Sequence, residues 1–95
     1  MFLVLLRFAQ NKAEVTRLMA GHNDWIAQGF ADGVFLLTGS IKPGLGGAVL
    51  ASGCTRAALE QRIAADPFVA EQVVTAEILE IGPGRLDARL SFLSA

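Results

Sequence analysis

The order of strand-like and helix-like stretches is the feature that most limits what this chain can fold into. Strands read as short runs rich in Val, Ile, Leu and Phe, and helices show apolar residues at three- and four-residue steps. The predicted strands are 2–9, 34–41, 48–52 and 72–81, one helix is expected at 13–30, and another follows Thr55. This β-α-β-β-α-β order predicts an α+β, ferredoxin-like sandwich, with two helices on one face of a four-stranded antiparallel sheet.

Both faces of the predicted sheet are apolar, although the helices can cover only one. In the first strand Phe2, Val4 and Leu6 point to one side, whereas Leu3 and Leu5 point to the other. Burying one such side chain stabilises a fold by ~1.5–3 kcal/mol. Leaving four or five exposed therefore forgoes ~6–15 kcal/mol, which matches the ~5–15 kcal/mol stability of a whole domain. Two sheets packed face to face would solve this problem, so we predict a homodimer.

Local signals mark where the predicted elements begin and end. Asn11 is a plausible N-cap for the long helix, and Gly33 suits a left-handed stop after it. Thr55 can cap the second helix, which cannot continue undisturbed through Asp66-Pro67. Asp66 would then cap a fresh short turn with Pro67 at its first position. For the tail, 83–95, the sequence is equally compatible with a helix and with an added strand.

Composition limits the classes of function. Ninety-five residues predict a single domain, 1–95, with a core at about 2–82. A net charge of −1 gives no electrostatic footprint for nucleic acid or an anionic membrane surface. One cysteine and one histidine exclude an internal disulfide and a zinc cage, so we expect no metal and no cofactor. No apolar run reaches the ~20 residues that span a bilayer. We expect a cytoplasmic protein.

His22, the sole histidine, lies on the predicted apolar stripe of the long helix, with Trp25 at its edge. Two interpretations stay open at this point. The ring can be a core histidine satisfied by a backbone carbonyl, or it can be a general acid or base, since its ordinary pKa suits proton transfer near neutral pH. The second role needs an orienting carboxylate. Asp66 is the best candidate, whereas Asp24 points away from His22.

Other residues carry weaker signals. Trp25 and Phe68 could wall an aromatic-binding cleft or simply fill the core. The glycines at 44, 46 and 47 match no phosphate-binding fingerprint and are interpreted as hairpin glycines. Ser40 has no elbow motif around it, so a serine hydrolase is not predicted. Cys54 is expected to be a small packed residue.

The sequence resembles the YciI-like (YCII-related) family of the dimeric α+β barrel superfamily over about 2–81. The resemblance is carried by His22, by the stretch 33–39 with its flanking glycines, and above all by Ala65-Asp66-Pro67-Phe68-Val69. It implies a ferredoxin-like fold that dimerises through the sheet and a His22–Asp66 pair in a cleft between helix and sheet. Ser40 stands where the family commonly has Gly-Pro, at the expected rim of that cleft. Related members include a dehydrochlorinase and, in the wider superfamily, muconolactone isomerase.

Together these observations favour a cofactor-independent enzyme of the lyase or isomerase type, possibly dehydrochlorinase-like. Asp66 would orient His22, and His22 would move a proton on a small cyclic or aromatic organic acid or phenol. Trp25, Ser40 and Phe68 are the expected substrate-binding residues. A non-catalytic module that binds a small ligand in the same cleft, and a purely structural dimer subunit, are the alternatives.

Overall fold

A computed structural model describes residues 1–94 of the chain. Its sheet contains β1 (Phe2–Phe8), β2 (Phe35–Ile41), β3 (Gly46–Ala51) and β4 (Val74–Glu80). Its helices are η1 (Lys12–Glu14), α1 (Val15–Ala31), α2 (Arg56–Ala64), α3 (Pro67–Ala70) and η2 (Ala88–Leu93). All strand pairs are antiparallel, in the order β2-β3-β1-β4. The predicted α+β, ferredoxin-like fold is confirmed.

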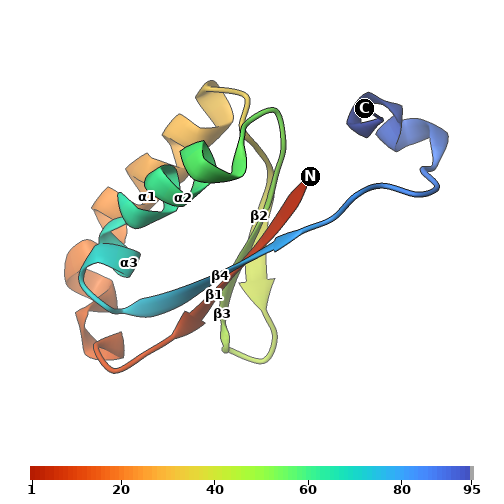
Figure 1. Cartoon of the computed structure of the whole chain (residues 1–95). Coiled ribbons are helices and arrows are strands. Elements are labelled where there is room, and N and C mark those ends of the chain that lie inside the picture. The colour runs from red at the N-terminus through yellow and green to blue at the C-terminus, as the bar shows by residue number, and fades with distance from the viewer. Residues whose placement is uncertain (95) are drawn as a thin grey trace.

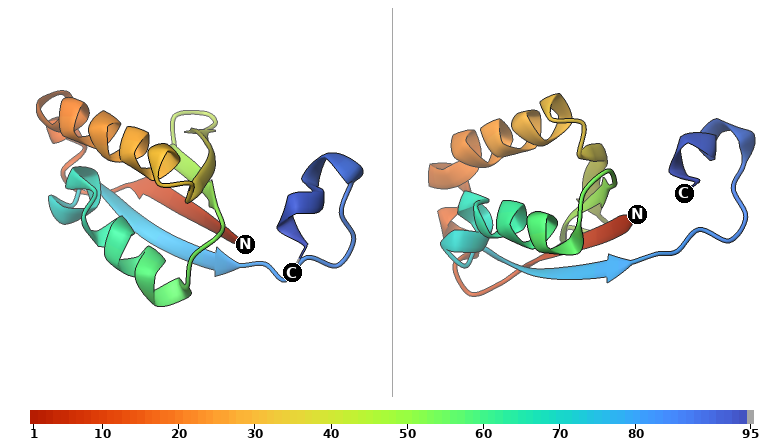
Figure 2. Two further views of the ribbon diagram at one scale, coloured as in Figure 1. Left: turned by 90° about the horizontal axis from the view of Figure 1, so that it is seen from above. Right: turned by 45° about the horizontal axis from the view of Figure 1, so that its top comes forward.

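The helices α1, α2 and α3 cover one face of the sheet, and Figure 2 shows the other face without a covering layer. The inward side chains of β1 alternate, as expected for a strand. They form one buried cluster with Leu59 and Ile63 of α2 and Phe68 of α3. The buried apolar core is Phe2, Val4, Leu6, Trp25, Phe35, Val49, Ala51, Leu59, Ile63, Phe68, Val73 and Val74.

The face of α1 turned toward the sheet is largely the predicted one. The partly buried apolar side chains of α1 that pack against the core are Val15, Leu18 and Ile26. Trp25 and Gly29 are the fully buried residues of the helix. A Cβ at Gly29 would lie 2.1 Å from Cδ2 of Phe35, so the helix backbone rests directly on a large ring of β2 at that point.

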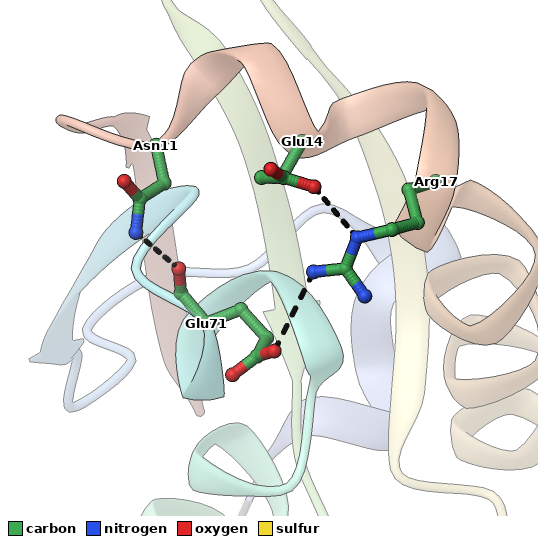
Figure 3. Close-up of polar contacts among 4 residues, drawn as sticks. All are labelled: Asn11, Glu14, Arg17 and Glu71. Atoms are coloured by element: carbon green, nitrogen blue, oxygen red, sulfur yellow. Dashed lines mark hydrogen bonds and ion pairs between the residues drawn. The ribbon is translucent and has the colours of Figure 1, made fainter.

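The start of α1 differs from the prediction. The Asn11 side chain caps no helix; its Nδ2 donates instead to the carbonyl oxygen of Glu71 at 2.8 Å (Figure 3). Arg17 donates through Nε to Glu14 at 2.6 Å and lies 3.6 Å from Glu71. These contacts tie the first turns of α1 to the residue that follows α3. Gly33, with φ of +73°, ends the helix as predicted.

The uncovered face of the sheet carries a group of apolar side chains, here called the open face: Leu3, Leu5, Leu37, Ala48, Leu50 and Leu79. The register pairs Leu3 with both Leu50 and Leu79, and Leu37 with Leu50. Leu37 is 55% exposed and Leu79 is 40% exposed. Arg7 and Glu77 form a 2.8 Å ion pair on the same face. The predicted second apolar face is therefore present, and nothing in the described chain covers these two leucines.

Beyond β4 the chain leaves the sheet as an extended segment and ends in η2 (Figure 1). The tail is thus a short 3-10 helix rather than an added strand. Among residues 1–94, the helices are too short or too polar to cross a membrane.

Candidate functional site

The junction between α2 and α3 places Asp66 inside the molecule. Thr55 caps α2 as predicted, with its Oγ1 accepting from the amide of Ala58 at 3.1 Å. Asp66 caps α3 with Pro67 at the first helical position, and its Oδ1 accepts from the amide of Phe68 at 3.0 Å. The Asp66 side chain is 0% exposed. A capping carboxylate is thus buried at the start of a helix, where the backbone dipole favours negative charge.

The same oxygen of Asp66 lies 2.8 Å from Nδ1 of His22. A carboxylate only accepts hydrogen bonds, so Nδ1 of His22 carries the proton and donates it. His22 therefore bonds a carboxylate, not the backbone carbonyl that a purely structural core histidine would use. Its side chain is 14% exposed. Nε2 has no hydrogen-bond partner among the described residues, and His22 lines a cavity.

Two aromatic rings hold the imidazole in its plane. The ring of Phe68 lies parallel to it, with centroids 4.0 Å apart and an interplanar angle of 5°. Trp25 lies at 5.7 Å and 26° from the imidazole, and its Nε1 donates to the carbonyl oxygen of Arg62 at 2.8 Å. A hydrogen bond at Nδ1 and a stacked neighbour fix both the tautomer and the rotation of His22. This is the preorganisation that a proton-transfer group needs.

The second oxygen of Asp66, Oδ2, is buried and has no partner within the described part of the chain. An unpaired buried polar atom costs free energy, and more so when it is charged. The carboxylate is therefore held only through Oδ1, by Nδ1 of His22 and the amide of Phe68.

His22 and Phe68 help to line a cavity of about 280 Å³ between α1 and the sheet. An apolar cavity of roughly 150 Å³ holds benzene, so this volume suits one substituted ring. The polar side chains in its wall are His22, Asn23, Thr38 and Ser40. The apolar side chains in its wall are Leu6, Phe8, Met19, Ile26, Phe68 and Val74.

An irregularity in β2 brings its two hydroxyls into this wall. The pairing register with β3 shifts between Phe35 and Leu37. Such a bulge inserts one residue and reverses the alternation beyond it. Phe35 therefore faces the core and Leu37 faces the opposite side. Thr38 and Ser40 then turn toward the helices and line the cavity.

Two glycines of β3 form part of the cavity wall. The sequence prediction assigned Gly46 and Gly47 to a hairpin, but both belong to the strand. A Cβ at Gly46 would lie 2.0 Å from the carbonyl oxygen of Leu6, so the strands could not approach as they do. Gly47 pairs with Leu6 and Ser40 and leaves space where a side chain would enter the cavity.

The predicted site residues are thus brought together with one exception. His22, Ser40 and Phe68 line the cavity, and Asp66 lies directly behind His22. Trp25 lines instead a separate cavity of about 460 Å³ between α1 and α2. The Trp25 ring lies beside the imidazole and belongs to the buried core. Core filling was the alternative interpretation of Trp25. The sequence did not point to Asn23 or Thr38 as residues of the cavity wall. Asn23 is one of several polar residues on its helix, and the inward position of Thr38 depends on the bulge in β2.

Comparison with known proteins supports the fold. No protein-family model matches the sequence, and no curated protein matches it in sequence. Among solved structures, the chain is similar to 5-chloro-2-hydroxyhydroquinone dehydrochlorinase (TftG) from Burkholderia phenoliruptrix AC1100, in complex with 2,5-dihydroxybenzoquinone. The TM-score is 0.70 at 12% identity, over 88% of this chain and 96% of the other. At this identity the likeness establishes the fold that the two proteins share, and function must be argued from the site.

Proposed function

We propose that this protein is a cofactor-independent enzyme that transfers a proton on a small oxygen-bearing ring bound in the His22 cavity. The observation that carries the proposal is the bonding of His22, whose Nδ1 is held by buried Asp66 while Nε2 has no partner among the described residues. Asp66 is the orienting residue and His22 the general acid or base. The likeness to a dehydrochlorinase supports chemistry of the lyase or isomerase type.

In an elimination, the ring reacts as a keto tautomer in which the leaving group is bound to a tetrahedral carbon. Nε2 of His22 removes a hydroxyl proton, the released electron pair forms a carbonyl and shifts the neighbouring double bond, and the leaving group departs with its bonding electron pair. In an isomerisation, the resulting imidazolium returns the proton to a different ring atom. Both steps place a positive charge on His22 beside the Asp66 carboxylate, which stabilises that charge. Neither step requires an oxidant or a reductant.

The cavity wall favours a phenol or enol over a carboxylic acid. Thr38, Ser40 and Asn23 can each bond a ring hydroxyl or carbonyl oxygen, and the apolar side chains of the wall can pack on the ring itself. Among the described residues that line the cavity there is no lysine or arginine to pair with a carboxylate. The proposed substrate is therefore a small hydroxylated ring rather than an organic acid.

The proposal includes a homodimer formed through the open face. Leu37 and Leu79 are exposed there at 55% and 40%. Packing the two open faces together would remove this apolar surface from water. Leu37→Lys should shift the protein toward monomer in sedimentation equilibrium. Ala27→Lys, at an exposed position of α1, is the control and should leave the assembly unchanged. An unchanged mass in both variants would refute this interface.

The proton-transfer role is tested on chlorinated and non-chlorinated hydroxyhydroquinones. Chloride release and exchange of ring protons with deuterated water are followed by NMR for the wild type, His22→Ala and Asp66→Asn. We expect His22→Ala to lose at least roughly 100-fold in rate, as general bases typically contribute. Full turnover by His22→Ala would disprove the catalytic role. Binding of an unchanged compound would identify the alternative, a non-catalytic ligand-binding module.

A further inference from the structure

The segment 82–94, here called the arm, is fastened to the sheet at its base and then leaves it. The amide of Ile81 donates to the carbonyl oxygen of Met1 at 2.8 Å, and the Met1 amine donates to the carbonyl oxygen of Ile81 at 3.2 Å. Figures 1 and 2 show the chain beyond this point standing clear of the helices and of the sheet in every view. The arm therefore projects from the end of β4 in a direction set by β1.

The polar groups of the arm bond within the arm itself. Asp87 accepts at Oδ1 from the amide of Arg89 at 2.9 Å and from its Nε at 3.0 Å. The amide and hydroxyl of Ser94 donate to the carbonyl oxygen of Ser91 at 3.1 and 2.7 Å. No hydrogen bond or ion pair in the described structure joins residues 82–94 to the rest of the chain. The arm thus has local structure and no polar attachment to its own domain.

The arm contains more large apolar residues than a tail that remains in water usually does. Leu86, Leu90, Phe92 and Leu93 are apolar, and Phe92 is 63% exposed while Leu90 is 41% exposed. Tails that remain in water are depleted in large apolar and aromatic residues. A segment with this composition gains stability by packing against a protein surface.

A second copy of this chain is the partner that the surface favours. Leu79, on the open face, and Ile81, just before the arm, are each 40% exposed, so the apolar surface runs from the open face into the arm. Arg85, in the arm, and Glu80, at the end of β4, have no ion-pair partner among the described residues, so each can pair with an opposite charge on a second copy.

We infer that the arm packs on a second copy of the chain, with Leu90 and Phe92 against apolar residues beside that copy's open face. The inference rests on the homodimer of the proposed function and is independent of the chemistry at His22. Packing of the arm on its own open face is the competing arrangement. The two differ in a measurable way, since an arm on its own sheet would block association and an arm on a second copy would strengthen it.

The test is photo-cross-linking of the full chain with Phe92→p-benzoylphenylalanine at low micromolar concentration. Irradiation should give a covalent dimer on a denaturing gel. Ala57→p-benzoylphenylalanine, at an exposed position of α2 on the covered side of the sheet, should give none. In parallel, sedimentation equilibrium should show the dimer dissociation constant of Leu90→Ser/Phe92→Ser raised at least tenfold over the wild type.

Each other outcome overturns the inference in a distinguishable way. A stable dimer whose position-92 cross-links stay within one chain, or do not form, would refute the arm contact and leave the open-face dimer standing. Tighter association of the Leu90→Ser/Phe92→Ser variant would show that the arm covers its own sheet. A monomeric wild type would refute both the arm contact and the homodimer, with no bearing on turnover by His22.

Discussion

The imidazole of His22 lies flat on the ring of Phe68, with centroids 4.0 Å apart and ring planes 5° from parallel. Phe68 is 6% exposed, so the stack is held inside the molecule rather than at its rim. Its backbone amide bonds the same Asp66 oxygen that Nδ1 of His22 approaches. One short helix therefore supplies the carboxylate and the flat surface that orient the imidazole.

Phe68→Leu should separate the effect of Phe68 on the orientation of the His22 ring from its effect on the stability of the protein. The substitution keeps most of the buried apolar volume, so it should cost about 1 kcal/mol in free energy of unfolding. Loss of the flat support should lower the rate of proton transfer by roughly 10–100-fold, because small displacements of catalytic groups are costly. Urea unfolding and the hydroxyhydroquinone assay measure the two effects. Phe30→Leu, at a 44% exposed position, should leave the rate unchanged; equal rate losses in both variants would contradict the support role.

Gly29→Ala tests the close contact between the backbone of α1 and Phe35. The added Cβ would lie 2.1 Å from Cδ2 of Phe35, so helix and sheet must move apart. We expect a loss of about 1–3 kcal/mol in free energy of unfolding, although alanine is the better helix former. Gly21→Ala is the matched control in the same helix, because its Cβ would meet only the flexible Pro67 ring at 3.1 Å. A Gly29→Ala variant as stable as Gly21→Ala would disprove the close contact.

Gly47 variants of increasing size test whether the cavity beside His22 is the ligand site. The position faces the cavity, where a Cβ would meet the carbonyl oxygen of Gly39 at 3.3 Å. Gly47→Ala should weaken binding of hydroquinone slightly, and Gly47→Leu should weaken it at least tenfold by filling the space. Calorimetry gives the affinities, and circular dichroism checks the fold. Unchanged affinity in a folded Gly47→Leu variant would place the ligand elsewhere.

The Asp32–Arg62 pair makes a prediction about acid stability. The hydrogen bond from Arg62 to Asp32, at 2.8 Å, lowers the pKa of that carboxyl below its ordinary value of 3.8, and the hydrogen bond from Gln28 lowers it further. A carboxyl whose pKa is lower in the folded state than in the unfolded state stabilises the fold at pH values above its unfolded-state pKa. That stabilisation is lost as the pH falls through its folded-state pKa. The destabilisation caused by Asp32→Asn should therefore shrink as the pH falls from about 5 to 3. Urea midpoints measure it.

The control for this pair is Asp24→Asn, at an exposed position for which the described residues provide no ion pair. Its effect on the urea midpoint should be small at every pH. A cost of Asp32→Asn that stayed constant down to pH 3 would show that the contact contributes through packing and not through charge.

The strands and both long helices could be predicted because each is a periodic run bounded by a specific local signal. The Thr55 and Asp66 caps belong to this class, since capping depends on residues two or three positions apart. The burial of Gly29 was not predicted, because its contact with Phe35 is tertiary and leaves no local pattern. The contact of Asn11 with Glu71 is tertiary too, so the sequence could not distinguish it from an N-cap.

The site was predictable only in part. The sequence named Asp66 as the best candidate for the carboxylate that orients His22. Only the resemblance to a family placed the pair in one cleft, as no sequence spacing brings the two side chains together. Thr38 entered the cavity wall through a bulge, and a one-residue shift between strands has no signature in composition. Trp25 was assigned to the ligand because aromatic residues suit both clefts and cores, and here its indole nitrogen is already bonded to Arg62.

The tautomer of His22 is the most direct test of the account, because the chain holds a single histidine whose imidazole signals need no separation from others. Nitrogen-15 NMR of the neutral ring should show the proton on Nδ1, with Nε2 unprotonated. Asp66→Ala should abolish that preference. A neutral ring protonated on Nε2 in the wild type, or a tautomer mixture equal to that of Asp66→Ala, would contradict the proposal that Asp66 presents Nε2 to a substrate.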